Sequence, residues 1–258
     1  MTSRNSPLTK AVLLAAGRGA RMKGLTSDLP KPMIPVAGTP VLERILSGLT
    51  AAGIRQFLIV TGYKADVIRS HFGDGSRQGI AVTYAHQIVQ DGTGRVVELA
   101  REFTGQDSFL LGYGDILVAD TTYSAIQDQW TKKATDGILT VKLGEDLRKG
   151  AVAVFDREFN LCELVEKPGE AEIEKLRLQY GNFKPWYNAG IYVFTPRIFD
   201  YTARLQKSVR GEYELPDALR HMARDGLKLT GFVITDQWMD VRDSEALARA
   251  DRQFGKQD

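Results

Sequence analysis

Short runs of apolar residues alternate with amphipathic stretches along the first half of the chain. The apolar runs are typical of strands buried on both faces, and we expect strands at residues 11–15, 56–61, 80–85 and 108–112. The amphipathic stretches predict helices at 40–52, with Thr39 as N-cap, at 64–72, and at 93–103, with Val96, Val97, Leu99, Ala100 and Phe103 facing inward. This alternation predicts a mainly parallel sheet flanked by helices, with ligands at the carboxyl ends of its strands.

The second half has a different pattern, in which strands follow one another through short connections. We expect strands at 137–143, 150–155, 161–166, 188–194 and 227–234, and helices at 171–179, 197–205, 213–224 and 244–254. No repeat, low-complexity tract or linker separates the halves. The pattern therefore predicts a Rossmann-like α/β domain at residues 10–258, after a loose leader at residues 1–9. Its halves would meet near residue 135, and a smaller substrate-binding lobe would lie in the second.

Composition excludes several classes of partner. A formal net charge of +2 over 258 residues is too balanced to indicate a nucleic-acid or membrane-surface binder. No stretch approaches the roughly 20 apolar residues of a membrane span, and residues 1–9 lack a signal-peptide core. Cys162 is the single cysteine, so an internal disulfide is impossible and a reducing compartment is the simpler interpretation. We expect a cytoplasmic protein, and its oligomeric state is left open.

The segment after the first predicted strand combines glycines with basic residues. Backbone N–H groups of a glycine-rich turn can approach a phosphate closely, and nearby cations favour its charge. The residues concerned are Gly17, Arg18, Gly19, Arg21 and Lys23. The sequence therefore predicts a phosphate-binding loop.

Two common phosphate-binding motifs do not fit this loop. Gly19 and Gly24 have the spacing of a Walker A motif, but Leu25 follows where lysine is required. Gly17 and Gly19 begin a dinucleotide fingerprint, but Met22 replaces its third glycine. An NAD-linked oxidoreductase is therefore disfavoured.

A third pattern fits over a longer stretch. The segment resembles the signature of the sugar-1-phosphate nucleotidyltransferases, with Leu14-Ala15-Ala16-Gly17, Gly19, Arg21, Leu25-Thr26 and Pro30-Lys31-Pro32-Met33. A solvated basic loop would explain the charges, but not two prolines around one lysine. The resemblance covers residues 10–250 approximately. It implies transfer of a nucleotidyl group from an NTP to a sugar 1-phosphate, with release of pyrophosphate.

The resemblance also implies roles within this signature. Leu14, Ala15, Ala16, Gly17 and Gly19 would bind the nucleotide. Arg21 would act on the β- and γ-phosphates, and Lys31 on the α-phosphate. These two residues are the expected catalytic groups.

Asp115 follows an apolar strand, where a carboxylate would face the ligand. A carboxylate near a triphosphate is repelled unless a divalent cation lies between them, and Mg²⁺ is typically held by one or two carboxylates. The resemblance makes Asp240 the second ligand, although Asp236 and Asp243 lie close by. A turn or helix cap is the alternative role for Asp115. We expect Mg²⁺ as the cofactor.

Gln87 and the turn at Gly92-Thr93-Gly94 are expected to bind the base. A glutamine amide can pair with a base edge, and glycine lets the backbone approach a flat ring. The turn is similar to that of uridylyltransferases, so UTP is favoured, although Tyr113-Gly114-Asp115 also occurs in cytidylyltransferases. A polar loop with Thr93 as a helix cap is the alternative.

The resemblance places the sugar phosphate on a third cluster. Its members are Gly150, Glu166, Lys167 and Asn188, with Glu166 and Asn188 on sugar hydroxyls and Lys167 on the phosphate. A surface ion pair at a strand end is the alternative for Glu166 and Lys167. We assign Tyr213, Glu214 and Asp217 to structure.

The chain departs from the family pattern at two places. Arg242-Asp243 stands where Gly-Thr or Gly-Ser often follows the aspartate, and Lys23-Gly24 stands where Arg-Pro is frequent.

Two alternative functions stay open. One is nucleotidyl transfer to a non-sugar phosphate, such as phosphocholine or inositol phosphate. The other is a non-catalytic, regulatory nucleotide-sugar-binding protein.

Overall fold

The computed structural model describes residues 5–19, 22, 28–181 and 183–255. These residues divide into two compact units. We call residues 5–89, 109–132 and 236–255 the parallel unit, and residues 90–108 and 133–235 the mixed unit. Each is described by itself. The predicted single domain, with halves that meet near residue 135, stays a prediction.

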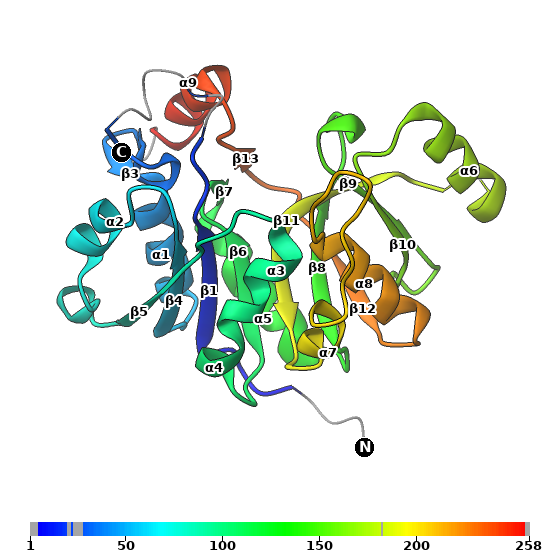
Figure 1. The fold of residues 1–258 in the computed structure, drawn as a ribbon, viewed down its shortest axis with the longest axis horizontal. Helices are drawn as coiled ribbons and strands as arrows, with labels where there is room; N and C mark the ends of the chain where they lie inside the picture. The colour runs from blue at the N-terminus through cyan, green and yellow to red at the C-terminus, as the bar shows by residue number, and fades with distance from the viewer. Residues whose placement is uncertain (1–4, 20–21, 23–27, 182, 256–258) are drawn as a thin grey trace. The chain divides into compact units, whose positions relative to one another are not determined.

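The parallel unit is built on four parallel strands. Their order is β6 (Phe109–Tyr113), β1 (Lys10–Ala15), β4 (Gln56–Thr61) and β5 (Ala81–His86), with β1, β4 and β5 easily followed in Figure 1. Consecutive residues of β1 and β4 are buried, because helices cover such sheets on both faces. Leu14 is in register with Val60 and Tyr113, so the carboxyl ends of these strands lie together.

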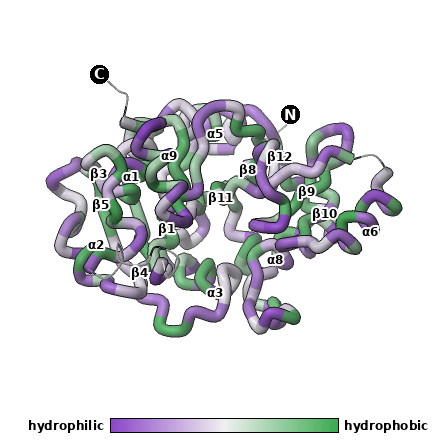
Figure 2. Tube along the Cα trace, turned by 90° about the horizontal axis from the view of Figure 1, so that it is seen from above, coloured by the Kyte–Doolittle hydropathy of each residue, from purple (hydrophilic) through white to green (hydrophobic). Residues whose placement is uncertain are grey.

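Four α-helices and two small ladders complete the described part of the parallel unit. The helices are α1 (Val41–Ala51), α2 (Ala65–Phe72), α5 (Asp120–Lys132) and α9 (Ser244–Phe254). The ladders are β2 (Pro35–Val36) with β3 (Thr39–Pro40), and β7 (Ile116–Val118) with β13 (Trp238–Asp240). Figure 2 shows hydrophobic and hydrophilic residues interspersed along the helices, as amphipathic packing requires.

Two predictions for this unit need correction. Thr39 is not the N-cap of α1, because it belongs to β3 and Pro40 takes the cap position without a side-chain bond. Residues 1–9 were predicted to be a loose leader, but Asn5, Ser6 and Leu8, in the described part of that stretch, are hydrogen-bonded to α5. The backbone N–H and carbonyl of Leu8 both bond the Gln127 amide, at 2.9 and 2.8 Å, and Leu8 is buried.

The mixed unit contains a mostly antiparallel sheet. Its strand order is β10 (Leu161–Glu166), β9 (Ala151–Phe155), β11 (Trp186–Phe194), β8 (Gly137–Lys142) and β12 (Leu229–Val233), and only the β8–β12 pair among these is parallel. The helices are α3 (Thr93–Val97), α4 (Arg101–Thr104), α6 (Glu170–Tyr180), α7 (Ile198–Thr202) and α8 (Leu215–Arg224). The buried face of α8 packs on β10.

The predicted helix at 93–103 is interrupted. A 3-10 turn at Glu98–Ala100 separates α3 from α4 and changes the direction of the side chains that follow. Val96, Val97 and Ala100 are buried as predicted, whereas Leu99 is 40% exposed. The mixed α/β class, with a parallel sheet flanked by helices, is otherwise as predicted. None of the helices in the described ranges has the length and apolarity to span a bilayer.

Candidate active site

The signature loop follows β1 and packs against two glycines. Gly62 comes just after the neighbouring strand β4, and Gly114 comes just after the neighbouring strand β6. Gly114 N–H donates to the Leu14 carbonyl at 2.9 Å. A Cβ at Gly62 would lie 2.7 Å from the Ala16 carbonyl oxygen, so this close packing requires glycine. Sequence reasoning missed Gly62, whose only signal is its place just after a buried strand.

The described start of this loop has the form of a phosphate-binding turn. Ala15 and Ala16 are buried, Gly17 is exposed, and Gly19 has a φ of +64° that favours glycine. Met22 is fully buried and its N–H donates to the Gly19 carbonyl at 2.9 Å. Met22 therefore anchors the loop in the core. The expected catalytic Arg21, and Lys23 with it, lie outside the described residues.

Lys31, Asp115 and Asp240 come together from three distant segments of the parallel unit. Lys31 begins a 3-10 turn, Asp115 lies between β6 and β7, and Asp240 ends β13. The β7–β13 ladder sets the two aspartates side by side, because Asp240 is in register with Ile116 and Val241 N–H donates to the Asp115 carbonyl at 3.0 Å. The Lys31 ammonium donates to the Asp115 carboxylate and lies 3.9 Å from Oδ1 of Asp240.

Arg242 is a further described member of this charged cluster. Its Nε lies 3.2 Å from Oδ2 of Asp240, and the Arg242 side chain is 16% exposed. Opposite unit charges about 4 Å apart attract by about 4 kcal/mol at an effective dielectric of 20, so both aspartates are well compensated here. Asp243 instead caps α9, since its carboxylate accepts from Ala246 N–H at 2.8 Å. Asp236 is exposed.

The donor set of this cluster suits one kind of metal. Asp115 and Asp240 are partly exposed, and no group of three His, Cys, Asp or Glu side chains able to hold a metal ion occurs in the described parts of the chain. A zinc or calcium site would need more protein ligands, whereas Mg²⁺ is bound by one or two carboxylates together with phosphates and waters. The two aspartates therefore fit Mg²⁺ carried in with a nucleotide.

The residues expected to bind the base fall in different units. Gln87, in the parallel unit, follows β5 and donates its backbone N–H to the Thr61 carbonyl at 2.8 Å. Gly92 and Thr93, in the mixed unit, belong to a turn at residues 91–94 that is hydrogen-bonded to residues 213–215 at the start of α8. We call this pair of segments the strap. Gly94 N–H donates to the Tyr213 carbonyl at 2.8 Å, and Tyr213 N–H to Asp91 at 2.7 Å.

This strap gives the glycine turn a packing role. Gly92 has a φ of +117°, and a Cβ there would lie 2.3 Å from the Tyr213 carbonyl oxygen. The Thr93 hydroxyl accepts from Leu215 N–H at 3.3 Å, so it caps α8 rather than α3. Tyr213, assigned to structure from the sequence, is thus part of the same assembly as the turn.

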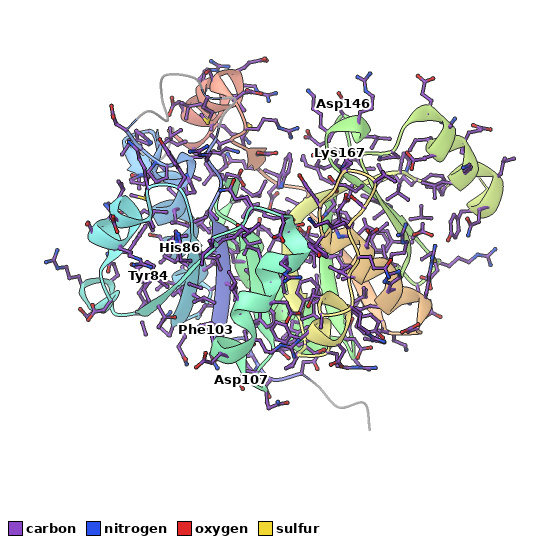
Figure 3. All side chains as sticks on the ribbon, in the orientation of Figure 1. Tyr84, His86, Phe103, Asp107, Asp146 and Lys167 are labelled. Carbon is purple, nitrogen blue, oxygen red and sulfur yellow. The ribbon has the colours of Figure 1, made fainter. Side chains whose placement is uncertain are left out.

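The residues expected to bind the sugar phosphate lie in the mixed unit. Lys167 N–H donates to the Gly150 carbonyl at 3.1 Å, which joins the ends of β9 and β10, and a Cβ at Gly150 would meet the Tyr187 hydroxyl at 2.4 Å. Lys167, labelled in Figure 3 beneath the loop that carries Asp146, adopts a positive φ of 46°. Its ammonium lies 3.6 Å from the Glu166 carboxylate.

The amide of Asn188 is held within its own strand. Its Nδ2 donates to the Tyr192 hydroxyl at 2.6 Å, and its Oδ1 accepts from Gly190 N–H at 3.2 Å. These bonds lie at a register shift of β11, where Gly190 has a φ of +82°. The bulge fixes the orientation of Asn188.

Arg210 is a site candidate that sequence reasoning missed. Its guanidinium lies 3.6 Å from Glu166 and 2.8 Å from Glu214, and the Glu214 side chain is 7% exposed. Burial raises the pKa of Glu166, while Lys167 and Arg210 act in the opposite direction. The only sequence signal for Arg210 is a basic residue in a glycine-containing turn before a helix, which is too common to single it out.

The parallel unit thus combines a parallel α/β sheet, a glycine loop and a Lys–Asp–Asp cluster, the features that the sequence signature predicts. Residues 10–257 match the nucleotidyl transferase family, and the chain belongs to that family. The resemblance inferred from the signature is confirmed.

Relatives of known description agree with this family. The chain is 30% identical, over 94% of its length and 65% of the relative's, to a low-salt glycan biosynthesis nucleotidyltransferase of Haloferax volcanii. It is also 30% identical to the UTP–glucose-1-phosphate uridylyltransferase AglF of that organism, over 90% of each chain. A Bacillus anthracis structure described as a glucose-1-phosphate thymidylyltransferase, with sucrose bound, has a TM-score of 0.81 at 25% identity, over 96% of each chain. The chain spans about half to two thirds of several other curated relatives.

Proposed function

We propose that the protein transfers a nucleotidyl group from an NTP to a sugar 1-phosphate and releases pyrophosphate. The observation that carries this proposal is the cluster of Lys31, Asp115 and Asp240. Three residues far apart in sequence, each at a position expected from the family signature, meet at the carboxyl ends of the parallel strands. A merely structural ion pair would not need the signature's other members, such as the glycine loop packed on Gly62 and Gly114.

In the proposed reaction, an oxygen of the sugar phosphate attacks the α-phosphorus in line with the departing pyrophosphate. The new bond joins that oxygen to the α-phosphorus, and the bond from the α-phosphorus to the bridging oxygen breaks. No covalent enzyme intermediate is needed, so catalysis consists of positioning and charge compensation. Mg²⁺ on Asp115 and Asp240 would supply Lewis-acid compensation of the phosphate charge.

The parallel unit would bind the nucleotide. Backbone N–H groups of the loop from Leu14 to Gly19 would face the phosphates. Lys31 would stabilise charge that develops on the α-phosphate, and Arg21 would hold the leaving pyrophosphate. The bond of Lys31 to Asp115 supports this role, because it holds the ammonium beside the proposed metal ligand.

The mixed unit would bind the sugar phosphate. Lys167 would hold the attacking phosphate, and Arg210 is a second cation near Glu166 that could share its charge. Glu166 in its ionised form, with Asn188, would accept hydrogen bonds from the sugar hydroxyls.

UTP is the nucleotide we favour, because the Gly92-Thr93-Gly94 turn is similar to that of uridylyltransferases. Gln87 would pair with the base, and Gly92 and Thr93 would line its binding segment. The names of the relatives include both a UTP-dependent uridylyltransferase and a thymidylyltransferase, so the base needs direct measurement.

The test is pyrophosphate release by the full chain with Mg²⁺. UTP, dTTP, CTP, GTP and ATP are each offered with glucose, N-acetylglucosamine and mannose 1-phosphates, then with phosphocholine and inositol phosphate. Release with UTP and a sugar phosphate supports the proposal in full. Release only with a non-sugar acceptor rejects the sugar assignment. If folded protein binds nucleotide but releases no pyrophosphate with any acceptor, catalysis is rejected.

A further inference from the structure

Arg242 occupies a position where the family pattern often has glycine. It is held firmly, because it lies between β13 and the N-cap of α9. Its backbone N–H donates to the Asp240 carbonyl at 2.9 Å, and Asp243, the next residue, caps α9. Its guanidinium is therefore a fixed neighbour of the Asp240 carboxylate, at 3.2 Å, rather than the end of a loose surface side chain.

Among the residues that the structure describes, this cluster contains the carboxylates of Asp115 and Asp240 and the cations of Lys31 and Arg242. Lys31 pairs with Asp115 and Arg242 pairs with Asp240, so each of the two described aspartates already has a cationic partner without any metal. A divalent cation on Asp240 would place a positive ion next to Arg242. Repulsion between the two would oppose metal binding, unless an anion joined them.

We propose that Arg242 links metal binding to phosphate binding at this site. In the ligand-free protein it compensates Asp240 and weakens the affinity of the aspartates for a divalent cation. When metal occupies the aspartates, Arg242 exchanges Asp240 for an oxygen of the nucleotide's triphosphate or of pyrophosphate. Arginine suits this exchange because its planar guanidinium binds carboxylate and phosphate with the same fork of donors. The inference rests on the proposed function for the presence of metal and nucleotide.

The experiment compares wild-type protein with Arg242→Gln and Arg242→Lys. Free Mn²⁺ is followed by its paramagnetic resonance signal during titration, first with Mn²⁺ alone and then with inorganic pyrophosphate, a base-independent probe. Arg242→Gln should bind Mn²⁺ alone roughly tenfold more tightly, and pyrophosphate with Mn²⁺ roughly tenfold more weakly, because one close charge is lost. Arg242→Lys keeps the charge and should stay near wild type for Mn²⁺ alone.

The matched control is Arg197→Gln. Arg197 pairs with Asp136 at 3.3 Å in the mixed unit, and its loss should leave both affinities unchanged. Equal affinities of wild type and Arg242→Gln, or absence of Mn²⁺ binding even with pyrophosphate, would overturn the inference. If wild type releases pyrophosphate from an NTP while these affinities are equal, the inference alone fails. If no acceptor supports turnover, the proposed function fails and the Mn²⁺ titrations still decide the role of Arg242.

Discussion

Lys31 of the parallel unit and Lys167 of the mixed unit meet their carboxylates differently. Lys31 is 13% exposed and donates directly to Asp115, whereas Lys167 is 44% exposed and lies 3.6 Å from Glu166. The first lysine is oriented in advance, as a group that stabilises a transition state should be. The second has more freedom, which suits a group that captures a substrate. The comparison leads us to predict that the buried Lys31–Asp115 pair serves catalysis and the exposed Lys167–Glu166 pair serves binding.

Removing each lysine should separate these roles and give the largest effect. Lys31→Ala should lower kcat about 10²–10³-fold, because charge on the α-phosphate loses its fixed partner. Lys167→Ala should act mainly on the KM for sugar 1-phosphate. Steady-state pyrophosphate release measures both, with Lys132→Ala, an exposed pair with Asp128, as control. Equal losses of kcat in both variants would contradict the distinction.

A substitution that creates a steric clash with the backbone should destabilise the parallel unit without removing a charged group. Gly62→Ala places a Cβ 2.7 Å from the Ala16 carbonyl, and should lower the free energy of unfolding by about 1–3 kcal/mol. Nucleotide affinity should fall as well, because the displaced segment belongs to the signature loop. Chemical denaturation and nucleotide titration are the measurements. Gly17→Ala is the control, since open space surrounds Gly17, and equal destabilisation by both would refute the packing account.

The pH dependence of KM for sugar phosphate tests the proposed role of Glu166 in the mixed unit. Burial raises the pKa of Glu166 above its ordinary value of 4.5. Protonation removes the acceptor for sugar hydroxyls, so the KM for sugar phosphate should rise as pH falls through that raised pKa. Glu166→Gln should raise KM at neutral pH and abolish this acidic limb. If KM for sugar phosphate still rises at acidic pH in Glu166→Gln, a group other than Glu166 is responsible for the pH dependence.

The smallest effect is expected at the strap. Thr93→Ala removes the hydroxyl that accepts from Leu215 N–H at the start of α8, and should cost about 0.5–1.5 kcal/mol of stability. Thermal unfolding tests this against Thr131→Ala, whose exposed hydroxyl bonds only locally to the Asp128 carbonyl. Equal shifts of Tm in the two variants would show that the cap contributes nothing particular.

Much of the parallel sheet could be predicted, because strands buried on both faces leave continuous apolar runs. Helix α5 could not, although it is 13 residues long. Its buried face consists of Thr122, Tyr123, Ile126 and Trp130, in a stretch that is polar on average. The short β7–β13 ladder was also missed, since pairing of three-residue strands depends on tertiary contacts rather than on local pattern.

The candidate site also contains some residues that could be predicted from the sequence and others that could not. Asp115 and Asp240 were selected as a pair because the family signature constrained them, and the structure places both against Lys31. Gly62 and Arg210 were missed, because nothing in their neighbours reveals the contact each one makes. Thr93 was found, but its hydroxyl caps a helix more than 100 residues away in sequence. Local chemistry can be predicted from residue type, whereas partners from distant segments could be predicted only where the family signature links them.

The ladder between β7 and β13 has a consequence for the order of folding. Asp240 reaches Asp115 only when residues 238–240 pair with a strand more than 100 positions earlier, and loop closure over that separation is entropically costly. During synthesis, the sheet of β1, β4, β5 and β6 can assemble well before Asp240 leaves the ribosome. The acidic pair therefore forms later than this sheet, and a nascent chain acquires it only when β13 pairs with β7.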